Sequence, residues 1–328
     1  MFRISTLYLI IIISVFSDFF ASRTAISKSI LQHDADGVKI RATVTVSKNG
    51  FGNFSRINDA VAMAPNNSNG DEGFFHIKIM EGEYEEYIKI DQNKRYLMMS
   101  GAGINRTIIT GNHSYEDGWG IDVSATFIAS GSHFICKHLT IRNTAGPTKG
   151  QALALMCSGD LSVFYNCSIE GYQDTLWKCN LYARRPSKGN GNEITAQGRT
   201  NPKDQSGIVI QGCAIKPTHD LARSNYTVKT YLGRPWKNYS RTIIMQTYID
   251  GFIEPAGWDK SSGEALKTLY FAEYNNSGTG SNTTNRVTWP SYHIISATIA
   301  SNFTVSRFID GDSWIPQTKV PYIGGLVP

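Results

Sequence analysis

Residues 136–141 read CKHLTI, and residues 164–169, 28 positions further along the chain, read FYNCSI. The same shape returns in residues 209–215 (VIQGCAI) and 243–249 (IIMQTYI), and turn-forming residues such as Asp250 and Gly251 follow the copies. Repeats of about 20 to 50 residues are typical of solenoid architectures, in which each coil places its strand above the same strand of the coil before it. The repeat therefore predicts an all-β chain wound as a parallel β-helix.

The rest of the chain agrees with this prediction. From about residue 74, short runs rich in β-branched and aromatic residues alternate with Gly, Asn and Asp, as at residues 75–79, 107–110, 126–128 and 207–210. Such runs indicate strands, and a sandwich or a propeller would place hairpin turns at closer and more regular intervals. An amphipathic stretch at residues 57–64, which a turn at Pro65 follows, predicts a helix that covers one end of the core.

The spacing of the repeat is broken at one place. Leu139 lies 28 residues before Cys167, and Cys213 lies 34 residues before Thr247, but a shorter copy at residues 179–181 (CNL) begins only 12 residues after Cys167. Twelve extended residues reach at most about 40 Å, which is too short for three strands and their turns. We therefore expect that most of one coil is missing near residues 171–181.

The N-terminus indicates export. Arg3 precedes an apolar run at residues 7–16, and small residues follow at Ala21, Ser22 and Ala25. This is the pattern of a secretory signal peptide, and the alternative, a membrane anchor, needs a longer run to cross about 30 Å. We predict a signal peptide at residues 1–25 and a secreted mature protein with no membrane segment.

Glycosylation sequons support this prediction. Asn166 is expected to lie in a buried strand, where it could not be used. The ten sequon asparagines are Asn53, Asn66, Asn105, Asn112, Asn166, Asn225, Asn238, Asn275, Asn282 and Asn302.

Charge and cysteine content bound the kinds of partner. The net charge of +5 suits a secreted protein that acts on an acidic polysaccharide, and the excess is too small to indicate nucleic acid. An odd cysteine count leaves at least one thiol unpaired, and the spacing matches no metal site. We therefore expect no metal and no cofactor, and we interpret most cysteines as small buried apolar residues. The five are Cys136, Cys157, Cys167, Cys179 and Cys213.

Six motifs, in order along the chain, resemble those of the plant pectin methylesterases, or pectinesterases. The motifs are residues 143–147 (NTAGP), 150–155 (GQALAL), 171–176 (GYQDTL), 194–200 (ITAQGRT), 232–236 (LGRPW) and 311–314 (GDSW). The resemblance implies a right-handed, pectin lyase-like β-helix domain at residues 42–328. It also implies that the chain has no room for the inhibitor-like prodomain that many plant members carry.

The resemblance also implies roles for single residues. In this family, one aspartate attacks the methyl ester of galacturonate and forms an acyl-enzyme, and a second aspartate acts as acid and base. Asp174 matches the acid and base, and Gln151 and Gln173 match the residues that stabilise the oxyanion. Arg234 matches the arginine that orients the nucleophile, and Trp236 lines the sugar groove. Taken singly, each could be structural: a turn residue, or for Arg234 the partner in a surface ion pair.

The nucleophilic aspartate itself has no counterpart. In the family it lies in an Asp-Phe-Ile-Phe-Gly strand about twenty residues after the first aspartate, whereas here residues 176–179 (LWKC) lead directly into a stretch that resembles the following coil. Gly120 and Ile121 also replace threonines of the family, and Gly150 replaces a histidine. Without the carboxylate, we expect Arg234 to face the groove as a free cation. The remaining candidates stand in other contexts: Asp160, Asp204, Asp220 and Asp250.

Three hypotheses follow. The chain is a monomeric pectin methylesterase of the plant cell wall, or a relative that binds pectin without catalysis, or the product of a defective gene. The family motifs favour the first, and the missing carboxylate favours the other two. Pectate lyases and polygalacturonases share the architecture, but they need clustered carboxylates, which the sequence does not provide.

Overall fold

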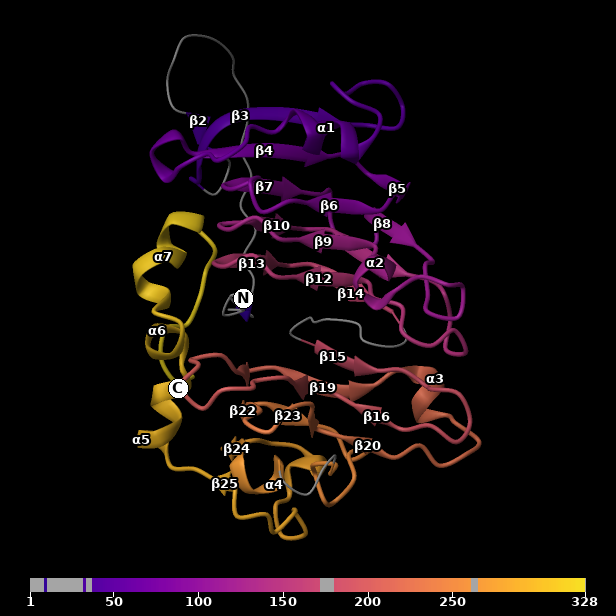
Figure 1. Ribbon diagram of the computed structural model, residues 1–328, viewed down its shortest axis with the longest axis vertical. Coiled ribbons are helices and arrows are strands. Elements are labelled where there is room, and N and C mark those ends of the chain that lie inside the picture. The colour runs from indigo at the N-terminus through magenta and orange to yellow at the C-terminus, as the bar shows by residue number, and fades with distance from the viewer. Residues whose placement is uncertain (1–8, 11–31, 34–36, 172–179, 261–264, 328) are drawn as a thin grey trace.

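The computed structural model describes residues 9–10, 32–33, 37–171, 180–260 and 265–327. Within these ranges, short strands stack in parallel into sheets that form three faces of a β-helix (Figure 1). The strands fall into an N-terminal stack and a C-terminal stack, which end at β14 and begin at β15 respectively. The predicted parallel β-helix is therefore confirmed. In the described residues, no helix is long and apolar enough to cross a membrane.

Each face has its own set of strands in the two stacks. The first face contains β3 (Lys39–Val46), β4 (Phe74–Ile79), β7 (Leu97–Ser100), β10 (Ile135–Lys137) and β13 (Ser162–Tyr165), then β18 (Ile208–Gln211), β22 (Arg241–Met245), β24 (Tyr270–Tyr274) and β25 (Tyr292–Ile294). The second contains β5 (Gly82–Glu85), β8 (Thr107–Gly111), β11 (Thr140–Asn143) and β14 (Ser168–Glu170), then β15 (Asn180–Ala183), β19 (Ala214–Pro217) and β23 (Tyr248–Ile249). The third contains β6 (Ile88–Ile90), β9 (Phe127–Ala129) and β12 (Leu155–Cys157), then β16 (Asn192–Glu193), β17 (Ala196–Gln197), β20 (Thr230–Tyr231) and β21 (Arg234–Pro235).

The corner between the first and second faces explains the repeat. His138, Asn166, Gly212 and Gln246 all have a positive φ, between 49° and 62°, and each turns the chain from one strand into the next. The following residue points inward, and its burial is nearly complete in all four copies. Strand pairing has the predicted register, since Thr140 pairs with Ser168 and Ala214 pairs with Tyr248. Asn166, however, lies at this exposed turn and not in a buried strand, so the expectation for its sequon is wrong. All ten sequon asparagines are exposed.

The two stacks meet at a seam. Each described circuit visits the second, third and first faces in turn, but the chain passes from β14 on the second face to β15 on the second face with only residues 171–179 between them. Among the described residues, no strand of one stack pairs with a strand of the other. The free edge of β13 pairs instead with β1 (Leu9–Ile10), which lies inside the predicted signal peptide.

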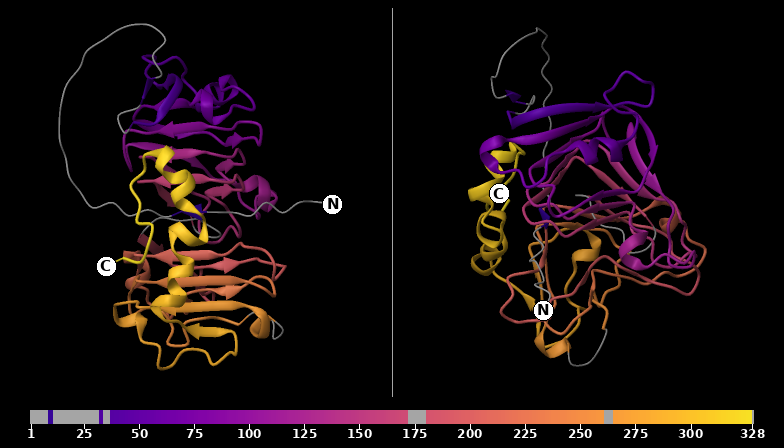
Figure 2. Two further views of the ribbon diagram at one scale, coloured as in Figure 1. Left: turned by 90° about the vertical axis from the view of Figure 1, so that its left-hand side faces the viewer. Right: turned by 45° about the horizontal axis from the view of Figure 1, so that its top comes forward.

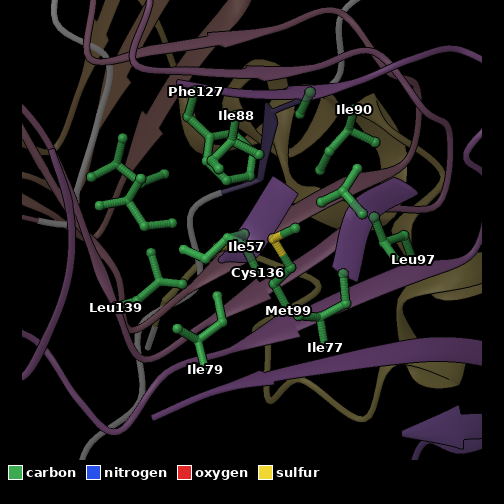
Figure 3. Packing of buried hydrophobic residues seen from close by; sticks show 14 of the residues in the cluster. Ile57, Ile77, Ile79, Ile88, Ile90, Leu97, Met99, Phe127, Cys136 and Leu139 are labelled. Atoms are coloured by element: carbon green, nitrogen blue, oxygen red, sulfur yellow. The ribbon is translucent and has the colours of Figure 1, made fainter. Parts of the chain in front are cut away.

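The interior is divided at the same place. One apolar cluster fills the N-terminal stack, where side chains from all three faces converge (Figure 3). A second cluster, around Trp258 and Phe271, fills the C-terminal stack, and the two share no residue. The predicted helix is confirmed as α1 (Ile57–Met63), whose buried residues join the first cluster and cover its end.

A C-terminal segment connects the stacks on the outer side of the first face (Figure 2). Trp314 and Ile315 pack against Val163 of the N-terminal stack, whereas Ala300 and Leu326 pack against the C-terminal stack. We call residues 297–327 the C-terminal strap. Its helices are α5 (Ala297–Ala300), η3 (Ser301–Phe303), α6 (Val305–Phe308) and α7 (Gly311–Thr318).

The remaining elements are short. They are β2 (Gln32–His33), which pairs antiparallel with β3, and η1 (Gly70–Glu72), α2 (Ile121–Ser124), α3 (His219–Ala222), α4 (Ala265–Thr268) and η2 (Thr279–Ser281).

Candidate functional site

Gln151 lies on the loop that leads from β11 into β12 on the third face. Its side chain is half-buried, and its carbonyl accepts the Tyr115 N–H at 2.9 Å. Asn143 fixes this loop, because its buried Nδ2 donates to the carbonyls of His113 at 3.0 Å and Leu153 at 3.1 Å. The motif that begins with Asn143 therefore holds the backbone around Gln151 in place.

Arg234 and Trp236 lie on the third face of the C-terminal stack. β21 pairs with β17, so that Arg234 lies opposite Ala196, and two of the six motifs meet as neighbouring strands. Gly233 is required at this contact, because a Cβ atom there would lie 2.0 Å from Thr195 Oγ1. Strand pairing thus sets the direction of Arg234.

The charge of Arg234 is partly balanced. Its Nε lies 3.9 Å from Glu193 Oε2 on β16, and its guanidinium lies 5.7 Å from the centre of the Trp236 ring. The expectation that Arg234 is a free cation is therefore wrong. The ion pair is long and its side chains are about one-third exposed (35% and 31%), so the attraction is weak and leaves the guanidinium able to bind a second anion. Glu193 carries no motif signal, and the sequence alone did not identify it.

The motif at residues 194–200 is structural where it is described. Gln197 Oε1 accepts the backbone N–H groups of Arg199 at 2.9 Å and Arg241 at 2.8 Å. Burial lowers the pKa of Arg199, whose guanidinium donates to the carbonyls of Asn201 and Pro202. These residues fold the loop after β17 and are not available to a substrate.

The structure brings only part of the predicted site into view. Gln151, Arg234 and Trp236 share the third face, with Gln151 on one side of the seam and the other two on the opposite side. Gln173 and Asp174 lie outside the described residues. Among the described aspartates, Asp160 lies between β12 and β13, where burial raises the pKa of its carboxyl.

The described residues contain no group of three or more His, Cys, Asp or Glu side chains that could hold a metal. Cys136, Cys157, Cys167 and Cys213 are buried free thiols, as expected for small apolar residues, and burial raises the pKa of Cys136. Cys179 lies outside the described residues.

Comparison with known proteins identifies the family. The sequence model of the pectinesterase family matches residues 43–178 and again residues 176–312, which is more than half of the chain. The chain belongs to the pectinesterase family. It is 57% identical to the probable pectinesterase/pectinesterase inhibitor 20 of Arabidopsis thaliana over 334 aligned positions, which take in 93% of this chain and 60% of that protein. The chain thus spans about three-fifths of the length of this curated relative.

Solved structures agree. The pectin methylesterase from carrot superposes with a TM-score of 0.84 at 38% identity, over 92% of this chain and 100% of that one. A pectin methylesterase solved in complex with a hexasaccharide superposes with a TM-score of 0.66 at 25% identity, over 81% of this chain and 96% of that one.

Proposed function

We propose that this pectinesterase-family chain binds pectin on its third face and cleaves galacturonate methyl esters only slowly, because it lacks the coil that carries the nucleophilic aspartate. The passage from β14 to β15 carries this proposal. It returns the chain to the second face within residues 171–179, whereas the described circuits that pair Thr140 with Ser168 and Asn180 with Ala214 take 28 and 34 residues.

The alignments support the same proposal. The 93% of this chain that aligns with the Arabidopsis relative is about 305 of 328 residues, so about 29 of the 334 aligned positions have no residue in this chain. Alignments with the other curated relatives have a similar excess. The family model also matches in two pieces that divide at residues 176–178. This number of missing positions is close to the length of one coil.

The remaining residues explain binding better than turnover. Gln151 and Gln173 would stabilise an oxyanion, and Asp174 would serve as acid and base, by resemblance to the family. Without the nucleophilic carboxylate, no acyl-enzyme forms, and the ester must be attacked directly by water with Asp174 as base. Loss of a central catalytic group typically costs several orders of magnitude in rate. Arg234 and Trp236 can still hold the sugar chain, the arginine through its charge and the tryptophan through its exposed ring.

The setting follows from the same resemblance. We infer that the chain is exported through its signal peptide at residues 1–25 and works as a glycosylated monomer in the plant cell wall, with a right-handed winding as in nearly all parallel β–β crossovers. Export from plant or insect cells should shorten the protein by about 21–25 residues. An intact N-terminus on protein retained in the cell would contradict this.

Methanol release from methylated pectin tests the proposed function. We expect the chain to release methanol at near-background rate and to retain weak binding to polygalacturonate that added salt reduces. Insertion of the family's missing segment between Leu176 and Cys179 should restore turnover, and Asp174→Asn should then abolish it. Robust release by the unmodified chain, lost in Asp174→Asn, would show that another group is the nucleophile.

A further inference from the structure

A stack of three aromatic rings stands on the loop beside Gln151. The Tyr87 and His113 rings have centres 3.6 Å apart at 14°, and the His113 and Trp119 rings have centres 3.5 Å apart at 11°. The stack ends at the surface, because Trp119 is 41% exposed. Since His113 covers one face of the indole, most of this exposed area belongs to the other face and the edge.

The inner end of the stack is fixed. Tyr87 donates its O–H to Asn112 Oδ1 at 2.9 Å and accepts the Asn112 N–H at 3.0 Å. Its ring lies so close to Gly111 that a Cβ atom there would be 2.7 Å from it. Burial lowers the pKa of His113, which also has a hydrogen bond with the backbone of Val123. The middle ring is therefore neutral at neutral pH and held in its plane.

The outer end is fixed by the loop itself. The Trp119 N–H donates to the carbonyl of Ser114 at 3.1 Å, and the Ser114 hydroxyl donates to Asp117 Oδ2 at 2.6 Å. The Glu116 N–H donates to the carbonyl of Lys149 at 3.2 Å, which joins this loop to the segment that ends in Gln151. Trp119 is therefore preorganised, and little side-chain entropy is lost when a ligand covers it.

We propose that Trp119 is a sugar-binding platform that takes a methyl-esterified galacturonate ring of the bound polymer. This inference rests on the proposed function and extends the groove into the N-terminal stack, away from Arg234. An aromatic face is apolar and carries partial negative charge, so that it suits the C–H face of a pyranose. Asp117 is already paired with Lys149, and Glu116 is exposed beside it. These carboxylates disfavour a free galacturonate and leave the neutral methyl ester as the better ligand.

The test measures binding and does not need turnover. Titration calorimetry with a methyl-esterified hexagalacturonate would compare the full chain with Trp119→Ala, Trp119→Phe and Phe51→Ala. Phe51 is the matched control, because its ring is 89% exposed at the N-terminal end of the coil stack. We expect Trp119→Ala to weaken binding about tenfold, which corresponds to about 1.4 kcal/mol. Trp119→Phe should lose less, and Phe51→Ala should match the unmodified chain.

The outcomes separate the two proposals. Unchanged affinity in Trp119→Ala, with clear binding by the unmodified chain, would overturn the platform and leave the proposed function standing. No binding of any galacturonate oligomer by the unmodified chain would overturn both. An equal loss for esterified and de-esterified hexamers would overturn the preference for the methyl ester.

Discussion

At the scale of the residue, Glu193 sets the charge that Arg234 offers to a ligand. The pair is long and partly exposed, so its contribution to stability is small, but a negative charge beside the guanidinium competes with an anionic sugar. The ring of Trp236 on the other side leaves Arg234 between a carboxylate and an aromatic face. The sugar affinity of the C-terminal stack therefore depends on a residue outside the six motifs.

Replacing Glu193 tests this dependence. Glu193→Gln should raise the affinity for de-esterified polygalacturonate by roughly two- to fivefold, the range of a weak ion pair, and the gain should shrink as salt increases. Glu72→Gln is the control, since it removes one negative charge from the Arg41 pair near the N-terminal end of the coil stack. An equal gain in both variants would attribute the effect to net charge alone.

Asp160 gives the molecule a local pH dependence. Its Oδ1 is buried without a partner among the described residues, and burial raises the pKa of its carboxyl. Because the folded pKa lies above the unfolded value of about 3.9, ionisation removes stability as the pH rises through the folded pKa. Asp160→Asn should therefore raise the melting temperature near pH 7 and leave it unchanged well below pH 4.

The gain should be modest, less than about 1 kcal/mol, because the side chain is only partly buried. Thermal melting across this pH range is the measurement, with Asp71→Asn as an exposed control. A melting difference of the same size at both ends of the range would contradict the role of ionisation.

At the scale of the element, the C-terminal strap is held to the C-terminal stack by two corner glutamines. Gln246 donates to the Val327 carbonyl at 2.6 Å and accepts the Val327 N–H at 2.8 Å. Gln211 donates to the Gly325 carbonyl at 2.9 Å. These side chains take the place of a neighbouring strand for the end of the chain.

Gln246→Ala should release residues 325–327 without loosening the core. Both residues would occupy the same left-handed conformation, so the change removes hydrogen bonds and little else, at a cost of roughly 1–3 kcal/mol that is confined to the strap. Hydrogen exchange should accelerate at Val327 and remain unchanged in β22. Gln205→Ala, at an exposed position, is the control, and global loss of protection in Gln246→Ala would contradict a local role.

Elements were predictable where local chemistry decides them. The corner repeat placed the strands of the second face in their observed register, because a turn-forming residue and an inward residue recur in every coil. The strap was not predicted, since the packing of α7 (Gly311–Thr318) on Val163 joins residues about 150 positions apart. The Glu193 contact was missed for the same reason: it depends on how β16 and β21 lie next to each other, not on a local pattern.

At the scale of the whole molecule, the seam divides one solenoid into two cooperative units. Each stack has its own apolar interior, and strands that border the seam have described strand partners on one edge only, apart from β13, which pairs with β1. Stability in a solenoid is a sum over coils and their interfaces, so removal of an interface weakens both neighbours. If residues 1–25 are removed on export, β13 also loses β1 and exposes an edge that favours association.

Native-state hydrogen exchange tests the division. Amides of β14 and β15 should exchange roughly tenfold or more faster than those of β11 and β22, which corresponds to about 1.4 kcal/mol in opening free energy. β11 and β22 are the matched comparison, because each is paired on both edges. Uniform protection across all four strands would show that the seam is closed by contacts as strong as a strand ladder.

The left-handed corner has a consequence for how such a chain can change length. Because every coil enters and leaves its neighbours through the same bend, the coils before and after a lost turn still present matching ends, and neither has to refold to meet the other. Insertions and deletions that equal one whole turn keep every other side chain facing inward or outward as before, whereas a change of half a turn would invert them. The natural unit of gain and loss in this architecture is therefore the complete winding, and a chain short of one winding can keep its outline and its binding surface after its chemistry is gone.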